Sequence, residues 1–128
     1  MMDFNRDSVF SLKYIEKEQI NENILSLLLE GEEIVSQYRT VRDQLVFTDK
    51  RIIAMNIKGI TGRKKELFTI PYKKIQYFSV QTVGFLELFP DAELSVFFAN
   101  GKVTVFEFKG DNEVLEISKT IAKYTFEA

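Results

Sequence analysis

The stretch from Thr40 to Pro71 constrains the fold of this chain more than any other. It contains three strand-like runs, 44–48, 51–57 and 66–71, separated by short turn-forming or glycine-bearing connections. Short runs rich in β-branched and aromatic residues, divided by tight turns, are typical of an antiparallel meander. The stretch therefore predicts an antiparallel sheet, and it is a signal of fold rather than of function.

The strand pattern extends to both sides of this stretch, from Glu33 to Lys109. Apolar and polar residues alternate, as they do when one face of a strand is buried. Asn100-Gly101 lies between two aromatic-rich runs and predicts a hairpin, because a two-residue primed turn needs positive φ at both positions. Seven strands are expected, near 33–42, 44–48, 51–57, 66–71, 75–83, 92–99 and 102–108.

A helix is expected after the last strand. Asp111 can cap its first turn, and lysines near its end suit the negative pole of the helix. Val114, Ile117 and Ile121 form a stripe that must be covered, since each large aliphatic side chain contributes about 1.5–3 kcal/mol when fully buried. We expect this helix to close one mouth of a partly open barrel. The residues expected in the core are Phe47, Ile53, Ile70, Ile117 and Ile121.

A second, amphipathic helix is expected from Tyr14 to Leu29. Its apolar residues recur at a spacing of four and three, which places them on one helical face, and charged residues populate the other face. Gly31 follows as a plausible end, because glycine tolerates the left-handed conformation. The apolar face consists of Ile20, Ile24, Leu27 and Leu28.

Composition excludes several classes of function. At 128 residues the chain fits one domain with a self-sufficient core. It lacks Cys and His, which removes disulfides, thiolate metal sites and the commonest general base. Its net charge of −2, from 17 basic and 19 acidic side chains, is far from the basic balance of nucleic-acid-binding proteins. No catalytic residue, cofactor or metal is expected.

The N-terminus does not read as a targeting segment. It carries an acid at Asp3 and lacks the apolar run of a secretory signal. The longest apolar runs, such as Leu27-Leu28-Leu29, fall far below the roughly 18 residues that a membrane span requires. A cytoplasmic protein is therefore expected.

Short motifs between Val41 and Leu94 occur together in a known family. They are Val41-Arg42-Asp43, Val46-Phe47-Thr48-Asp49-Lys50-Arg51, Gly59-Ile60-Thr61-Gly62, Ile70-Pro71-Tyr72, Phe78-Ser79-Val80 with Thr82 and Gly84, and Asp91-Ala92-Glu93-Leu94. With them the chain resembles the bacterial pleckstrin-homology-like (PH-like) domain family, from about Asn23 to Tyr124. We accordingly divide it into an N-terminal extension over 1–22, with the start of the amphipathic helix, and a PH-like domain over 23–128.

The resemblance carries expectations about fold and function. It implies a mainly β (α+β) fold, a seven-stranded bent antiparallel barrel or sandwich that a C-terminal helix closes, to which the N-terminal helix is an addition. It also implies that the protein has no enzymatic activity and that its protomers associate into closed rings.

Four cations bracket the connection between the third and fourth expected strands. They could hold a phosphate or an anionic lipid headgroup, or they could simply keep an exposed turn soluble. Asp43, in the short connection before them, would oppose an anion, and Lys73-Lys74 should lie at the opposite end of the sheet. The segment 59–62 between the cations is expected to be a structural turn, because a P-loop opens a helix and a KH-type clamp joins two helices. The candidate contacts are Lys58, Arg63, Lys64 and Lys65.

The densest apolar cluster outside the expected strands lies between residues 84 and 90. A connection this apolar is usually covered, either by the domain's own helix or by another chain, because large exposed apolar patches are unusual on monomers. Both covers stay open. The candidate contacts in an oligomer are Phe85, Leu86 and Phe89, with Leu88 beside them.

Three hypotheses of different classes follow. The first is a binding and assembly module that forms a homo-oligomer and presents a surface to a protein partner or ligand. The second is a peripheral binder of anionic lipid or a phosphate ligand through the basic loop. The third is an enzyme, for which no carboxylate pair is signalled, since Asp91 and Glu93 stand without a recognisable partner.

Overall fold

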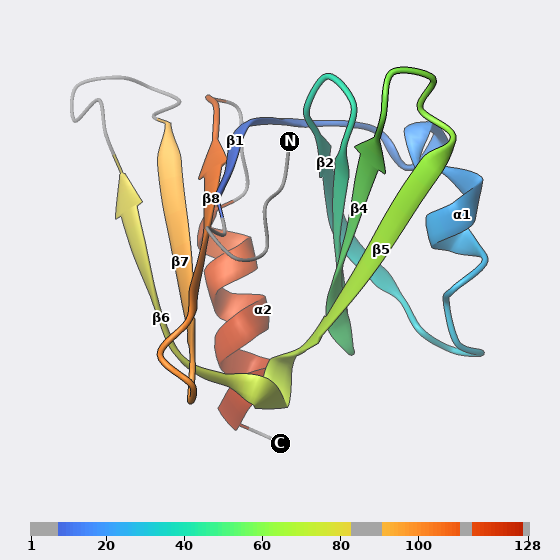
Figure 1. Cartoon of the computed structure of the whole chain (residues 1–128). Helices are drawn as coiled ribbons and strands as arrows, with labels where there is room; N and C mark the ends of the chain where they lie inside the picture. The colour runs from blue at the N-terminus through green and yellow to red at the C-terminus, as the bar shows by residue number, and fades with distance from the viewer. Residues whose placement is uncertain (1–7, 83–90, 111–113, 127–128) are drawn as a thin grey trace.

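The computed structural model describes residues 8–82, 91–110 and 114–126 (Figure 1). The described part of the chain folds into eight strands, two α-helices and two short 3-10 turns. The strands are β1 (Ser8–Tyr14), β2 (Ile34–Arg39), β3 (Gln44–Thr48), β4 (Arg51–Lys58), β5 (Lys64–Pro71), β6 (Ile75–Thr82), β7 (Ala92–Phe98) and β8 (Val103–Phe108). The helices are α1 (Glu22–Leu25) and α2 (Val114–Phe126), and the 3-10 turns are η1 (Lys17–Gln19) and η2 (Tyr72–Lys74).

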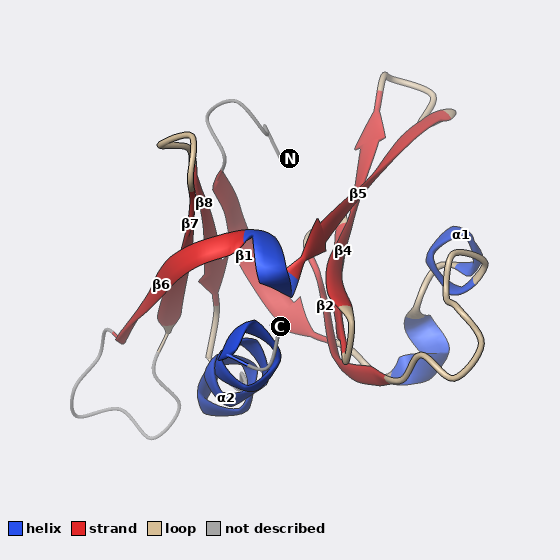
Figure 2. Ribbon diagram, turned by 90° about the horizontal axis from the view of Figure 1, so that it is seen from below, coloured by secondary structure: helices blue, strands red, loops and turns tan. Residues whose placement is uncertain are grey.

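All eight strands belong to one sheet, in the order β5-β4-β3-β2-β1-β8-β7-β6. The sheet bends into two halves, β2–β5 and β6–β8, which stand at an angle to each other with α2 between them (Figure 2). Strand β1 joins the halves, because it pairs antiparallel with β2 and parallel with β8. Strands β5 and β6 therefore form the two ends of an open sheet. No helix of the described residues is long and apolar enough to span a membrane.

The seven expected strands are confirmed, and β1 is an additional strand that the sequence pattern did not reveal. Its pairing with β8 shifts by one residue between Val9 and Leu12. Ser11 lies in that bulge with φ +62°, and this interrupts the alternation by which a strand is recognised. The hairpin at Asn100-Gly101 is confirmed, but its turn is not the expected two-residue primed turn. Gly101 has φ +84°, whereas Asn100 does not have positive φ, and the Phe98 N–H donates to the Lys102 carbonyl oxygen at 2.9 Å across a three-residue loop.

The expected helix from Tyr14 to Leu29 is wrong for most of its length. Tyr14 is the last residue of β1. The helix α1, whose N-cap is Asn21, is only four residues long. Asn21 begins it late, because its side chain accepts a hydrogen bond from the Asn23 backbone N–H at 2.8 Å. Of the expected apolar face, Ile20 and Ile24 are buried. The spacing of these two residues reflects the docking of their segment on the sheet and does not indicate a continuous helix.

The main core fills the angle between the two halves of the sheet and α2. All five residues expected in the core are buried: Phe47, Ile53, Ile70, Ile117 and Ile121. Ile117 and Ile121 on α2 belong to the main core and close it, which confirms the expected role of the C-terminal helix. Aromatic rings at its centre meet edge to face, with 4.8 Å between the centroids of Tyr38 and Phe108.

A second cluster lies on the opposite face of β3, β4 and β5. Ile53 belongs to this cluster and not to the main core. The chain from Ile15 to Ile34 folds over it, so that α1 packs on the outside of the first half of the sheet (Figure 1). Its buried members are Ile15, Ile20, Ile24, Val46, Ile53 and Met55.

Candidate functional site

The basic loop predicted from the sequence forms the exposed end of the β4–β5 hairpin. Lys58 and Lys64 face each other across the strands, and Lys58 Nζ lies 2.6 Å from Glu66 Oε1. Lys65 Nζ donates to Asn23 Oδ1 at 3.1 Å. Arg63 and Lys64 are exposed, and neither forms an ion pair with another described residue. Two of the four candidate cations are therefore available to an anion.

The β2–β3 turn lies at the same end of the strands as the β4–β5 hairpin turn (Figure 1). Arg42 Nη2 donates to the Gly59 carbonyl oxygen at 2.7 Å and so ties the two turns together. Asp43 is buried and accepts from the Ile57 backbone N–H at 2.9 Å. The Asp43 carboxylate therefore faces the hairpin backbone, and the expectation that it would oppose an anion stays a prediction.

The tips of both turns carry apolar residues in full contact with solvent. Val41 and Ile60 are each about as exposed as in an extended chain, at 101% and 104%. Exposed aliphatic residues next to cations are a combination suited to the interface of an anionic membrane. Lys73 and Lys74 lie in η2, beyond the other end of β5, which confirms that they cannot join the basic loop.

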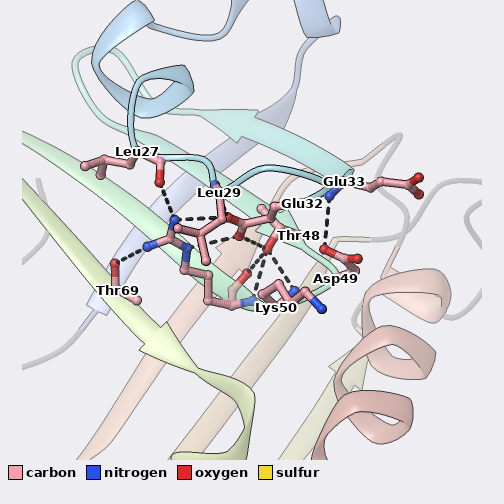
Figure 3. Close-up of polar contacts among 9 residues, drawn as sticks. Leu27, Leu29, Glu32, Glu33, Thr48, Asp49, Lys50 and Thr69 are labelled. Carbon is pink, nitrogen blue, oxygen red and sulfur yellow. Dashed lines mark hydrogen bonds and ion pairs between the residues drawn. The ribbon is translucent and has the colours of Figure 1, made fainter.

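The most extensive polar cluster of the described residues was not foreseen from the sequence. It surrounds Glu32, whose side chain is fully buried (Figure 3). Arg51 donates from Nε and Nη2 to the two carboxylate oxygens of Glu32, each at 3.0 Å. The Thr48 hydroxyl donates to the same carboxylate at 2.6 Å, and the Leu29 backbone N–H does so at 2.9 Å.

This cluster clamps the segment before β2 onto the β3–β4 hairpin. Burial by itself would raise the pKa of Glu32, but the hydrogen bonds from Arg51, Leu29 and Thr48 outweigh it and lower the pKa to about 2. A carboxylate that is ionised and fully occupied by donors is neither a general base nor an acid at neutral pH. The only sequence signal was the spacing of Thr48 and Arg51 across a tight turn, which did not identify the distant Glu32.

Tyr72 is a second buried polar residue, and a hydrogen bond to the backbone holds it. Its hydroxyl donates to the Thr48 carbonyl oxygen at 2.6 Å, and burial raises the pKa of the phenol. Asp91 accepts from the Gly110 backbone N–H at 2.8 Å and lies near Lys109, while Glu93 faces Glu107 across β7 and β8. Among the residues that the structure describes, no three acidic side chains gather in a way that could hold a metal ion.

The open side of the sheet carries apolar surface. Tyr77 on β6 is 59% exposed, and its ring stacks on that of Phe97 with 4.3 Å between the centroids. A groove of about 460 Å³ separates the end of β5 from the β7–β8 turn, and Ile70, Pro71 and Phe98 line it. Three candidate oligomer contacts predicted from the sequence lie outside the described residues: Phe85, Leu86 and Phe89.

Comparison with known proteins identifies relatives over most of the chain. The family model "Bacterial PH domain" matches residues 3–125. The uncharacterized protein YjqA of Bacillus subtilis (strain 168) is 40% identical over 105 residues, which are 80% of this chain and 82% of that protein.

Solved structures of bacterial proteins agree with this match. A DUF1696 family protein with a pleckstrin-homology domain from Shewanella loihica PV-4 superimposes with a TM-score of 0.75 at 30% identity, over 91% of this chain and 99% of the other. A pleckstrin homology domain from Shewanella amazonensis SB2B has a TM-score of 0.59 at 38% identity, over 81% and 83% of the two chains.

Proposed function

The chain belongs to the bacterial PH domain family, and from this premise we propose that it is a non-enzymatic binding and assembly module whose copies associate through the edges of their sheets. One observation carries the proposal: β5 and β6 are the two ends of an open sheet, and neither has a second neighbour among the described strands. An edge strand presents a row of backbone N–H and C=O groups that a strand of another chain can pair with.

Apolar surface beside one of these edges supports the proposal. Tyr77, Phe97 and Val103 follow one another across β6, β7 and β8 on the face that α2 does not cover. The corresponding outer face of the other half is covered by the segment from Ile15 to Ile34. Among the described residues, no segment covers the outer face that lies next to the β6 edge.

The two edges differ in sequence and in surroundings, which favours a head-to-tail association. Contacts between two different patches close into a ring when the rotation between subunits permits it, whereas a two-fold dimer uses one patch twice. A closed ring would also leave no edge strand exposed. The ring then presents the basic loop of each subunit as one of a set of repeated binding surfaces.

Mass in solution tests this function. We expect a particle several times the 14.9 kDa of one chain at micromolar concentration. Tyr77→Lys should lower that mass, because a charge beside the β6 edge must be desolvated on association. Leu115→Lys is the matched control, since Leu115 is 70% exposed on α2 and belongs to neither edge strand, and it should leave the mass unchanged. A particle of one chain's mass would contradict assembly.

A second candidate function, binding to an anionic membrane surface, is favoured by the position of Ile60. This residue projects from the hairpin that carries Arg63 and Lys64, so an apolar tip and unpaired cations reach the same surface. Such binding should weaken as salt rises, because exposed charges are screened beyond about 8–10 Å at physiological ionic strength.

Vesicle sedimentation with phosphatidylglycerol or phosphatidylcholine tests this candidate. Arg63→Glu with Lys64→Glu should abolish binding to the anionic vesicles and leave fold and assembly intact, since an exposed turn contributes little to stability. Lys73→Glu with Lys74→Glu makes the same change of charge at the opposite end of the sheet and should retain binding. If the hairpin variant binds as well as the unmodified protein, the hairpin is not a membrane contact.

A further inference from the structure

A pocket of about 450 Å³ opens between β1 and β2, on the other side of the β2–β3 turn from the basic hairpin. It is separate from the sheet edges to which we assign assembly. The described residues that line it include no acidic side chain; they are Ser11, Lys13, Arg39, Thr40 and Val41.

Two cations lie side by side in the lining of this pocket. Lys13 and Arg39 are direct cross-strand partners, and both side chains are exposed. Like charges opposite each other in a sheet are destabilising. Neither cation forms an ion pair with another residue of the described chain. Within the described residues the two cations form a positive pair without an acidic partner, which an anion held between the two side chains would neutralise.

Hydroxyl groups complete the lining. Thr40 Oγ1 accepts hydrogen bonds from the backbone N–H groups of Arg42 and Asp43, at 3.3 and 3.0 Å, which leaves its own hydrogen free to donate into the pocket. Ser11 adds a second hydroxyl from the bulge of β1, where it has φ +62°. Non-glycine residues in this conformation are strained, and such strain recurs at binding sites.

We propose that this pocket binds a phosphate group, with Arg39 and Lys13 as its charge partners and Thr40 and Ser11 as neutral donors. A guanidinium can bind two phosphate oxygens at once, and an ammonium adds a compact point charge. The pocket is larger than a phosphate group, so it has room for the organic part of a phosphate ester beside Val41. The same chemistry is present in a soluble phosphate ester and in a phospholipid headgroup.

Titration with inorganic phosphate, glycerol 3-phosphate and, as a neutral control, glycerol tests the site, with amide NMR shifts and calorimetry as readouts. Binding should shift the amide signals of Lys13, Arg39 and Thr40. Lys13→Gln with Arg39→Gln should weaken binding about tenfold or more. Lys73→Gln with Lys74→Gln removes the same charge from the opposite end of the sheet and should change the affinity less than about twofold.

Sedimentation with phosphatidylglycerol vesicles distinguishes the two sources of phosphate. Binding to vesicles alone, lost in the Lys13 and Arg39 double variant and kept in the Lys73 and Lys74 double variant, assigns the site to a lipid headgroup. Binding of the soluble esters with the same dependence assigns it to a free metabolite. The proposal is overturned if neither probe binds, or if the two double variants lose binding equally.

Folding of the variants has its own control. Removing a like-charge pair should leave the melting temperature unchanged or raise it, so a loss of binding without a fall in melting temperature is a loss of the site. Should the double variant melt lower, Lys13→Gln alone gives the same test with one cation retained. The mass of the unmodified protein in solution is independent of all these outcomes, so failure of the assembly proposal and failure of the phosphate site are distinguishable.

Discussion

At the scale of the residue, the most strongly held charges of the described structure stabilise the fold and take no part in chemistry. Glu32 has no exposed side-chain surface, and Arg51 neutralises it while reaching back to the Leu27 carbonyl oxygen at 2.6 Å. A buried ion pair of this kind is costly to break, since loss of one partner leaves the other uncompensated. The cluster fixes the position of the chain just before β2, where the segment that covers β3 to β5 joins the sheet again.

The pH dependence of stability should report Glu32. Its pKa is about 2 in the folded protein against an ordinary 4.5, so the ionised form is bound more tightly by the folded state. Stability of about 3 kcal/mol is then fully present above pH 4.5 and is lost as the pH falls toward 2. Urea unfolding between pH 7 and 2.5 measures this loss. Glu32→Gln should be less stable at pH 7 and show a shallower slope below pH 4.5; an unchanged slope would contradict the assignment.

Ser11 offers a second prediction at this scale. Ser11→Gly should stabilise the protein by about 0.5–1 kcal/mol, because glycine adopts φ +62° without strain and this gain exceeds its larger unfolded-state entropy. Ser118→Gly in α2 is the control and should lower stability by about 0.5 kcal/mol, since there glycine weakens a helix. Denaturant unfolding measures both changes, and a less stable Ser11→Gly protein would show that the hydroxyl is a structural contact.

At the scale of the element, regular alternation was readable from the sequence and interruptions were not. Strands β7 and β8 bury alternate residues, and β3 and β4 are apolar on both faces, so both patterns are readable in the sequence. In β1 the bulge at Ser11 shifts the alternation, and the partner of β1 on one side is β8, almost a whole chain length away. The helix predicted for the segment after β1 was wrong for the opposite reason. Ile20 and Ile24 have helical spacing, yet they are held by docking on Val46 and Ile53.

Packing of α2 gives the prediction that belongs to this scale. Ile117→Ala should lower the free energy of unfolding by about 2–5 kcal/mol, because Ile117 is fully buried and the substitution leaves a cavity under the helix. Leu115→Ala on the exposed side of the same helix should cost less than about 0.5 kcal/mol. Denaturant unfolding of the two variants compares them directly. A cost below half a kcal/mol for Ile117→Ala would mean that α2 does not seal the barrel.

At the scale of the whole molecule, the candidate sites depend on contacts that sequence patterns do not record. The basic hairpin was found because its four cations lie within eight residues, from Lys58 to Lys65. Lys13 and Arg39 are far apart in the chain and meet only because β1 pairs with β2. The apolar tip at Ile60 was read as part of a turn, and its full exposure follows from the hairpin geometry.

Assembly supplies the last prediction. Phe85 and Phe89 lie in the chain between the edge strand β6, which ends at Thr82, and β7, which begins at Ala92. If copies associate at this edge, replacing both residues with Ser should lower the assembled mass, because the apolar surface that drives association is lost. Light scattering after gel filtration measures the mass, and far-ultraviolet circular dichroism should show unchanged strand content.

Two further outcomes bear on the same pair of residues. If Phe85→Ser with Phe89→Ser reduces strand content and thermal stability, these rings belong to the domain's own core and the interface lies elsewhere. If the unmodified protein already sediments as one chain at micromolar concentration, where an interface worth about 8 kcal/mol would be half formed, the assembly proposal is wrong. The protein would then act as a monomeric adaptor, and the β6 edge would be open to a strand of a different partner.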